Sequence, residues 1–365
     1  MKVVHVEAGR HLYGGALQVL YLLRGLRQEA GRNVLVCPAG SAIAEAARDV
    51  ADTVYTVPMR GELDVVFVGR LLRVLRRERP DFVHLHSRRG ADLWGAVAAR
   101  LARVPVVLSR RVDNPESRWQ VRWKYRLYDH VITISEAIRN VLLAEGVPAE
   151  KVTCVHSAVD TELYRPGCDR EWFLRELRLE PADRVVGMVA QFIERKGHLV
   201  LLDAAPHVVA RIPGARFVLF GRGPLLVKME AEVASRGLPG AVRFGGFRED
   251  LHRLLPCLDV LAHPALMEGL GVSLLQAAAC GVPIVGAGVG GIPEVVRHGE
   301  TGYLTDPGDA RATGDFLCRL LEDAARRRAF GEAGRHDVEQ RFSIPSMVAG
   351  NRAVYTQLLE RRRDG

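Results

Sequence analysis

The sequence lacks the long apolar segments of a membrane-spanning or secreted chain. No apolar run reaches the roughly 18 residues that cross a bilayer. The first residues, MKVVHVEAGRHLYGG, pass from a strand pattern into a glycine loop, without the apolar segment and small-residue cleavage site of a signal peptide. We therefore expect a cytoplasmic protein, and peripheral association with the inner membrane is kept as a separate hypothesis.

The sequence also lacks paired cysteines. Its six cysteines are scattered along the chain, and none forms a Cys-x-x-Cys pair. This spacing argues against both a metal site and a disulfide and agrees with a reducing compartment.

Positive charges outnumber negative ones, and the net charge of +8 comes mostly from arginine. The arginines gather at residues 70–79, at Arg88 and Arg89, and over residues 110–126, where Trp119, Trp123 and Tyr125 are interleaved. Solvated helix faces explain the first cluster. The third is basic and edged by aromatic side chains, which fits contact with an anionic lipid surface. Nucleic acid is the least favoured partner, because no recognition motif accompanies the charge.

What is present is a globular composition over 365 residues, a length that favours two domains. In the first half, short apolar strands alternate with amphipathic helices, as in a parallel sheet covered on both faces. The expected strands are residues 3–7, 34–36, 82–86, 106–108 and 131–134. The expected helices are residues 16–29, 65–79, 90–102 and 117–128, and another begins after Ser135, a good N-cap.

After residues 155–167, which have little periodicity, the pattern restarts. Strands are expected in RVVGMVAQF, RFVLFG, VRFGGF and DVLAHP, and helices at residues 198–211 and 225–235. The predicted fold is α/β, with two doubly wound Rossmann-like domains that face a shared cleft. The domains are residues 1–160 and 161–344, and a helix over residues 345–365 packs back onto the first.

The stretch PALMEGLGVSLLQAAACGVPIVGA, residues 264–287, is almost wholly apolar but carries Glu268. A buried carboxylate needs a partner, so Glu268 either touches a polar ligand or caps a helix in solvent. Gly269 and Gly271 let the backbone approach a ligand at a helix start, where free N–H groups favour phosphate. Eight helical residues span about 12 Å, so Glu268 and Gln276 could lie at either end of a diphosphate. The alternative is that Gln276 faces solvent.

A second loop, AQFIERKGH at residues 190–198, follows the first strand of the second domain. Arg195 and Lys196 stand before a helix start, where cations oppose the helix dipole, so an anionic diphosphate would explain them better than solvent. Two further glycine loops, FGRGP at residues 220–224 and GRHLYGGALQ with Gly14 and Gly15, are weaker signals, and the latter lacks the dinucleotide fingerprint.

Polar side chains end two strands of the first domain. His84 and His86 are two residues apart and therefore point to one face of their strand. We expect His86, at the end of the strand, to reach the cleft; the alternative is a pair of satisfied core histidines. Arg110 and Arg111 end the strand PVVLSRR in the same way.

Taken together, these loops resemble the retaining glycosyltransferases of the GT-B fold, of the group 1 or family-four type. The resemblance covers essentially the whole chain. Its most specific part is MEGLGVSLLQAAACGVPIVGAGVGGIPEVVRHGETGYL, residues 267–304, which follows the family pattern nearly throughout. RKG, GRGP, the amino-terminal GG-x-x-x-x-L and VITISEAIR agree in order and spacing.

The resemblance implies a nucleotide-sugar bound to the second domain. Glu268 would hold sugar hydroxyls near the reacting centre and Lys196 would bind phosphate, so these two are the expected catalytic residues. The implied donor-binding set adds Gly14, Gly15, Gln191, Arg195, Arg222, Phe247, Arg248, Gly269, the amides of Leu270, Gly271 and Val272, and Gln276. His86, Arg110 and Arg111, which end strands of the first domain, are assigned to the acceptor side.

Two positions depart from the family pattern. The second acid of the family's pair, expected on the ribose hydroxyls, is Gln276, and the family's arginine in G-R-(L/F) is Gln191. Glutamine still donates and accepts hydrogen bonds, but a charge-assisted contact is lost at each place. Arg195 could compensate for Gln191.

The expected function is transfer, with retention, of a sugar from a nucleotide-sugar to a hydroxyl acceptor. A UDP-sugar is the favoured donor, and a cell-surface glycan or a lipid-linked acceptor such as lipopolysaccharide is the favoured acceptor. No metal or cofactor is expected, since helix amides and Lys196 stabilise the leaving phosphate. No enzymatic nucleophile stands out, so the family implies a front-face route. The alternatives are a GT-B nucleotide-sugar epimerase or phosphorylase, and a non-catalytic sugar- or lipid-binding module.

Overall fold

The computed structural model describes residues 1–12, 14–27, 31–87 and 90–363 and divides the chain into two compact units. Unit 1 comprises Met1–Ala158 and Ile344–Gly365, and unit 2 comprises Val159–Ser343. The divisions fall within two residues of positions 160 and 344, and the C-terminal helix belongs to unit 1. Arg88 and Arg89 lie outside the described residues. None of the described helices is long and apolar enough to cross a membrane.

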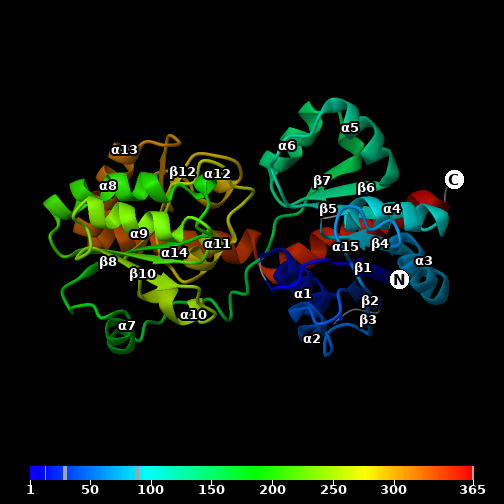
Figure 1. Cartoon of the computed structure of the whole chain (residues 1–365), viewed down its shortest axis with the longest axis horizontal. Coiled ribbons are helices and arrows are strands. Elements are labelled where there is room, and N and C mark those ends of the chain that lie inside the picture. The colour runs from blue at the N-terminus through cyan, green and yellow to red at the C-terminus, as the bar shows by residue number, and fades with distance from the viewer. Residues whose placement is uncertain (13, 28–30, 88–89, 364–365) are drawn as a thin grey trace. The chain divides into compact units, whose positions relative to one another are not determined.

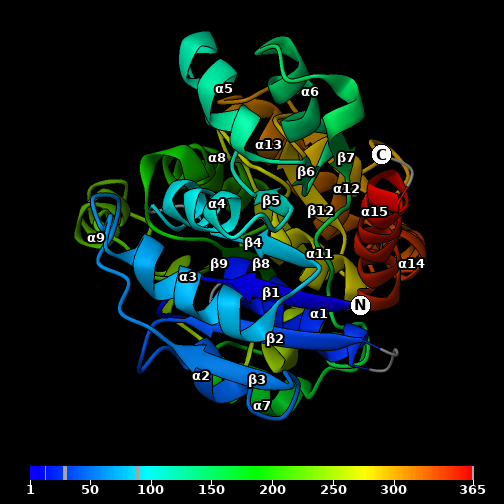
Figure 2. The ribbon, with the colours of Figure 1, turned by 90° about the vertical axis from the view of Figure 1, so that its right-hand side faces the viewer.

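Unit 1 is built on a seven-stranded parallel sheet with the order β3-β2-β1-β4-β5-β6-β7. Figure 2 shows the strands in this order, with β3 at the bottom and β6 and β7 at the top. The strands are β1 (Lys2–Val6), β2 (Arg32–Cys37), β3 (Thr53–Thr56), β4 (Phe82–Leu85), β5 (Val106–Arg110), β6 (His130–Thr133) and β7 (Val152–Cys154). The helices are α1 (Gly14–Leu26), α2 (Ala42–Ala46), α3 (Phe67–Glu78), α4 (Ala91–Leu101), α5 (Arg118–Lys124), η1 (Tyr125–Leu127), α6 (Glu136–Ala144), η2 (Ala149–Lys151) and α15 (Ile344–Arg363).

Helices cover both faces of this sheet, because side chains alternate along each strand. Val4 and Val6 of β1 belong to a buried cluster with residues of α3 and α4. Val3 belongs to a different cluster, with Tyr21 of α1 and Tyr355 of α15. Figure 1 shows α15, in red, within unit 1. The last helix therefore contributes to the core of the unit that the first residues begin.

Unit 2 repeats the architecture on a six-stranded parallel sheet with the order β10-β9-β8-β11-β12-β13. The strands are β8 (Arg184–Val189), β9 (Ala215–Phe220), β10 (Val242–Gly246), β11 (Val260–His263), β12 (Ile284–Ala287) and β13 (Gly302–Thr305). The helices are α7 (Arg170–Leu177), η3 (Glu194–Lys196), α8 (His198–Arg211), α9 (Leu226–Ser235), α10 (Leu251–Leu254), η4 (Leu255–Cys257), α11 (Val272–Ala279), α12 (Ile292–Val295), α13 (Ala310–Glu322) and α14 (Ala324–Arg341). The predicted pair of doubly wound Rossmann-like domains is confirmed.

Capping explains one helix start that the sequence predicts. Ser135 adopts an extended conformation, and its side-chain oxygen accepts a hydrogen bond from the Ile138 amide at 3.2 Å, so α6 begins at Glu136. Three short elements of unit 1, β3, α2 and β7, were not predicted. They have three to five residues each, which is too few to establish a periodic pattern.

The cysteines correct a sequence-based expectation. Cys168 and Cys257 form a disulfide within unit 2, with their Cα atoms 4.9 Å apart and a sequence separation of 89. The prediction of no disulfide is therefore wrong, because the fold brings Cys168, just before α7, next to Cys257 of η4, although the two cysteines show no local spacing. The free cysteines are Cys37, Cys154, Cys280 and Cys318.

Candidate active site

Four loops at the carboxyl ends of unit 2 strands pack against one another in the order of the sheet. They follow β9, β8, β11 and β12, which are neighbouring strands. Backbone hydrogen bonds join successive loops, from Phe192 N to Arg222 O at 3.1 Å, from Leu266 N to Arg195 O at 2.8 Å, and from Gly291 N to Glu268 O at 3.1 Å. In open α/β sheets this edge is where ligands bind.

Glycine is required where these loops meet. Gly197 has a φ of +73°, and a Cβ there would overlap the carbonyl oxygen of Pro264. Gly290 has a φ of +52°, and a Cβ there would overlap the carbonyl oxygen of Glu268. Backbone therefore packs directly on backbone, and the loop that carries Lys196 is held against the loop that carries Glu268.

Glu268 is the centre of the polar contacts between these loops. Its Oε2 atom lies 2.5 Å from Lys196 Nζ and accepts a hydrogen bond from His263 Nε2 at 2.8 Å. Its Oε1 atom accepts from the Gly269 amide at 3.2 Å. Burial alone would raise the pKa of Glu268, but the hydrogen bond from His263 and the charge of Lys196 outweigh it and lower this pKa to about 2. Glu268 is therefore a largely buried, ionised carboxylate with protein partners.

Glu268 does not cap α11, so one of the two interpretations of this residue is excluded. The N-cap of α11 is Gly271, with a φ of 90°. The first N–H groups of α11 have no partner inside the helix, as at any helix start. They remain available to an anion at this end of the sheet.

The position of Gln276 corrects a second expectation. Because α11 begins at Val272, only four helical residues lead to Gln276, a rise of about 6 Å rather than 12 Å. Gln276 is 7% exposed, so it does not face solvent either. Among the described residues its side-chain amide has no hydrogen-bond partner in the protein.

Two histidines near the Lys196–Glu268 pair were not predicted from the sequence. His263 ends β11 and His198 begins α8, and they are 1% and 3% exposed. Both ring nitrogens of His198 and Nδ1 of His263 are buried without a hydrogen-bond partner in the described part of the chain. Burial, with smaller contributions from His263 and Lys196, lowers the pKa of His198 to about 4. Their positions next to the RKG and MEG motifs were the available signal.

Of the remaining expected donor residues, Gln191, Arg195 and Arg222 lie on these loops. Phe247 and Arg248 follow β10, the next strand of the sheet. The Arg222 guanidinium lies 4.6 Å from the centre of the Phe247 ring. Arg248 is held by Asp250, at 2.6 and 2.7 Å, and by Glu176 at 2.6 Å, and these hydrogen bonds raise its pKa. Gln191 is exposed and Arg195 is half-buried.

In unit 1 the expected residues separate into two groups. A Cβ on Gly15, in the first turn of α1 after Gly14, would lie 3.7 Å from Cδ of Arg111. The charge of Arg111 also acts on His86, so these two residues are close to each other. Arg110 is different: it is 3% exposed and donates to Glu116 Oε1 at 2.9 Å and to Asn114 O at 2.6 Å. It orders the chain after β5.

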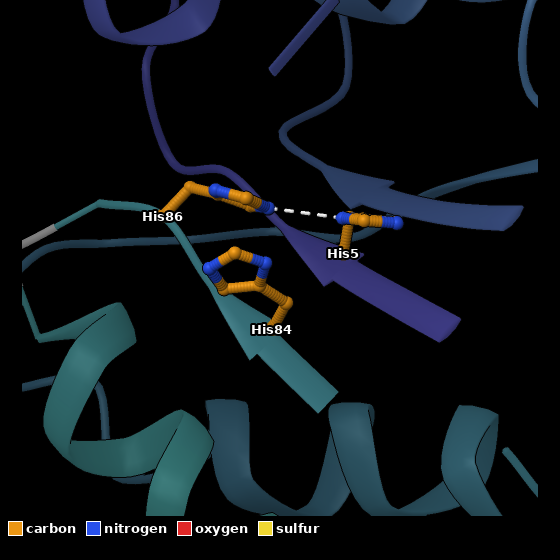
Figure 3. Close-up of side chains that lie close together, drawn as sticks. All are labelled: His5, His84 and His86. Atoms are coloured by element: carbon orange, nitrogen blue, oxygen red, sulfur yellow. Dashed lines mark hydrogen bonds between the residues drawn. The ribbon is translucent and has the colours of Figure 1, made fainter. Parts of the chain in front are cut away.

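We expected His86 to reach the cleft, and in the structure its side chain is almost fully buried. It is 2% exposed, and its ring lies beside those of His5 and His84 (Figure 3). The alternative, a pair of core histidines with all their hydrogen bonds made, does not hold fully either, because His86 Nδ1 has no hydrogen-bond partner among the described residues. These three side chains could hold a metal ion, since one nitrogen of each lies within 4.8 Å of the others. Both nitrogens of His5 and of His84 already have protein partners, however, so we describe the cluster as a hydrogen-bonded network.

Two doubly wound parallel sheets, one with a carboxylate–ammonium pair beside a glycine-started helix, define the class of protein: a glycosyltransferase of the GT-B fold. The fold is similar to that of Anabaena Alr3699/HepE in complex with UDP and glucose, with a TM-score of 0.85 and 23% identity over 98% of this chain and 99% of that one. A glycosyltransferase from Rickettsia africae has a TM-score of 0.87 and 16% identity, over 98% of each chain.

The chain belongs to the group 1 glycosyltransferases. The family model described as glycosyl transferases group 1 matches residues 169–337, and the model described as glycosyltransferase family 4 matches residues 13–163. The D-inositol 3-phosphate glycosyltransferase of Corynebacterium aurimucosum is 30% identical over 286 residues, which cover 73% of this chain and 68% of that protein. The N-acetyl-alpha-D-glucosaminyl L-malate synthase of Bacillus anthracis is 25% identical over 320 residues, covering 85% and 84%.

Proposed function

We propose that the protein transfers a sugar, with retention, from a nucleotide-sugar bound by unit 2 to the hydroxyl of an acceptor. The observation that carries the proposal is the Lys196–Glu268 pair, held at the start of α11 by loops that meet backbone to backbone. The pair places an ammonium and helix amides near one another, and together they suit a diphosphate. The names of the relatives, an N-acetyl-alpha-D-glucosaminyl L-malate synthase and a D-inositol 3-phosphate glycosyltransferase, support the same reaction class.

In the proposed mechanism, Glu268 and Lys196 have different roles. Lys196 carries three N–H donors and gives one to Glu268, so two remain for phosphate oxygens. Glu268, ionised at neutral pH, accepts hydrogen bonds from hydroxyls of the donor sugar. As the glycosidic bond breaks, negative charge develops on the phosphate, and Lys196 and the α11 amides stabilise it. The leaving phosphate takes the proton of the attacking hydroxyl on the same face, which gives retention without an enzymatic nucleophile.

A UDP-sugar is the proposed donor. Support comes from the similarity in fold to HepE, solved with UDP. A relative named as a GDP-mannose-dependent mannosyltransferase, 33% identical over 57% of this chain, makes guanine the competing base. Thermal shift with UDP- and GDP-sugars separates the two, because a ligand that binds the folded state raises the melting temperature. A larger rise with GDP-sugars would overturn the proposed base.

Substitution at the ion pair tests the proposed site. We expect Glu268→Ala and Lys196→Ala each to lower turnover of the donor at least 100-fold, the scale for losing a group that stabilises developing charge. Lys228→Ala, an exposed lysine of α9, is the matched control. Full turnover by both site variants would place the reaction elsewhere. Consumption of the donor without an acceptor would indicate an epimerase. A requirement for inorganic phosphate would indicate a phosphorylase. Donor binding without turnover would indicate a non-catalytic module.

No metal is proposed for the transfer step, because Lys196 and the helix amides supply the positive potential that a cation would otherwise provide. Turnover is therefore expected to be unchanged by EDTA. A loss restored by Mg²⁺ or Mn²⁺ would contradict this part of the mechanism.

The proposed acceptor is a cell-surface glycan or a lipid-linked acceptor such as lipopolysaccharide, reached from the cytoplasmic side of the inner membrane. A surface of unit 1 supports the membrane part. Trp119 and Trp123 of α5 are 72% and 56% exposed, and Arg126 lies 5.1 Å from the Trp123 ring. Exposed indole rings beside arginines match the interface of an anionic bilayer.

Vesicle sedimentation tests the membrane proposal. We expect more protein to sediment with phosphatidylglycerol vesicles than with neutral phosphatidylcholine vesicles at low salt. The double variant Trp123→Ala with Arg126→Ala should lose this difference, while Trp172→Ala, on α7 of unit 2, should keep it. Equal sedimentation with both kinds of vesicle would overturn the proposal. An affinity for duplex DNA that falls steeply as salt is raised would indicate that nucleic acid is the partner instead.

A further inference from the structure

Three buried histidines lie on the face of the unit 1 sheet that α1 and α15 cover. His5 of β1 is the register partner of His84 of β4, and His86 follows β4 by one residue (Figure 3). His5 and His84 are fully buried and His86 is 2% exposed. Polar rings are costly to bury unless each nitrogen has a partner, so the hydrogen bonds of this cluster can be followed atom by atom.

One chain of hydrogen bonds fixes the protons on two of the rings. His5 Nε2 lies 3.2 Å from Asn33 Oδ1, and an amide oxygen can only accept, so the proton is on His5 Nε2. In a neutral ring His5 Nδ1 is then an acceptor. It lies 3.0 Å from His86 Nε2, which must therefore carry the proton of His86. The remaining nitrogen, His86 Nδ1, is left with a lone pair.

The hydrogen bonds from Asn33 to His86 require that both rings are neutral, and near pH 7 they are. Burial lowers the pKa of His5 to about 4. Burial also lowers the pKa of His86 well below its usual value, with smaller contributions from His84, His5 and Arg111. A neutral ring offers a lone pair, whereas a protonated ring could only donate.

The lone pair of His86 Nδ1 has no partner in the described part of the chain. A buried polar atom left unpaired is unfavourable, because its lost contact with water is not replaced by a hydrogen bond. His86 stands at the carboxyl end of β4, the edge at which doubly wound sheets bind ligands. A hydroxyl is the simplest group that donates one hydrogen bond to such an atom.

We propose that Asn33 and His5 are positioning residues that hold His86 as its Nε2–H tautomer, so that Nδ1 accepts a hydrogen bond from a hydroxyl of the substrate. The part that concerns the substrate rests on the proposed glycosyl transfer. The part that concerns the tautomer does not, and can be tested in the free protein.

The cluster supplies its own control. His84 has separate partners, Tyr355 Oη at 2.6 Å and Ser109 Oγ at 2.8 Å. Tyr355→Phe therefore removes a hydrogen bond from the same buried cluster without touching the chain from Asn33 to His86. If the substitutions acted by loosening the core, variants at Asn33 and at Tyr355 would both change the state of His86. If they act by positioning, only the variants at Asn33 would change it.

The first measurement is the tautomer, read from two-bond ¹H–¹⁵N spectra of the full chain with ¹⁵N-labelled histidine. We expect His5 and His86 to be Nε2–H tautomers in the wild type and in Tyr355→Phe. Asn33→Leu should give a mixture of tautomers at His86, and Asn33→Asp, which keeps an acceptor oxygen, should restore a single one. A wild-type His86 with the proton on Nδ1, or an unchanged His86 tautomer in Asn33→Leu, would overturn the proposal.

The second measurement is turnover with the donor and an acceptor found by screening. Asn33→Leu should lower kcat about tenfold, the factor for one hydrogen bond, and leave the Kd of the donor unchanged. Tyr355→Phe should keep kcat within twofold. An unchanged kcat in a variant whose tautomer has shifted would refute the substrate role of His86. Full turnover by Glu268→Ala and Lys196→Ala would refute the proposed donor site instead, and the tautomer result would stand.

Discussion

Lys196 and Glu268 are 72 residues apart in the sequence, yet Lys196 Nζ lies 2.5 Å from Glu268 Oε2. Their side chains are 13% and 12% exposed. Removing two charges from water costs about as much as their attraction returns, so a pair of this kind is a weak way to stabilise a fold. Its position between the loops that follow β8 and β11 is therefore why we propose a role in donor binding for the pair.

The first prediction concerns acid stability. The pKa of Glu268 is lowered from 4.5 to about 2 in the folded protein, so its contribution is complete above pH 4.5 and is lost as pH falls toward 2. A shift of this size corresponds to about 3 kcal/mol. In urea titrations between pH 6 and 2, Glu268→Gln should lose less stability than the wild type. Glu171→Gln, whose side chain is 84% exposed, should behave as the wild type. Parallel pH profiles for Glu268→Gln and wild type would show that the ion pair does not act in this way.

The second prediction compares two glycines with similar backbone angles. Gly197 has a φ of +73° and its Cβ position is filled by the Pro264 carbonyl, whereas Gly237 has a φ of +68° and open space around it. Alanine at either position should destabilise the fold by about 1–2 kcal/mol, because a residue with a Cβ disfavours the left-handed conformation. Gly197→Ala must also push the two loops apart, so we expect a larger loss in urea titrations and loss of donor binding by calorimetry. Equal effects of the two variants would mean that the loop contact is not required.

The third prediction concerns the disulfide. Cys168 and Cys257 close a loop of about 90 residues, and a bridge of this kind typically stabilises by about 2–4 kcal/mol. Replacing both cysteines by serine should lower the free energy of unfolding by that amount. Cys318→Ser, at a free buried cysteine, is the control for the loss of a sulfur atom. Mass spectrometry after alkylation should find four reactive thiols in the unfolded, unreduced chain; six would show that the bridge does not form.

The fourth prediction separates a structural from a binding role for Arg110. This buried guanidinium is 2.9 Å from the Glu116 carboxylate, which Lys124 also contacts. Arg110→Ala leaves a largely buried acid with one cation fewer, so we expect a loss of about 3 kcal/mol in urea titrations. The Kd of the donor should not change. Arg122→Ala, on the exposed side of α5, should have no effect on either. Unchanged stability of Arg110→Ala with a raised KM for acceptor would support the acceptor role instead.

Motif loops were the most predictable part of this molecule. The helix over residues 198–211 was predicted with its observed bounds, because its ends carry clear signals. Lys196 and Glu268 were each selected for a diphosphate site, but their direct contact was not anticipated, since sequence does not report distances between strand ends. Strand order supplies that information: β8 and β11 are neighbours, so the loops that follow them must meet.

Buried polar partners were much harder to predict. His5 and Asn33 lie on β1 and β2, and His86 directly follows β4, so only the register of these three strands brings them together. His86 was placed correctly at a strand end, but no local pattern reveals the proton arrangement that its neighbours impose. The same holds for the disulfide, whose cysteines have no recognisable spacing.

The place of α15 bears on how the chain is made. Residues of this last helix, including Met347 and Tyr355, complete a buried cluster with residues of β1 and α1. A ribosome therefore finishes all of unit 2 while unit 1 still lacks part of its interior. During synthesis unit 2 can therefore fold completely first, whereas the core of unit 1 is completed only after α15 has been made.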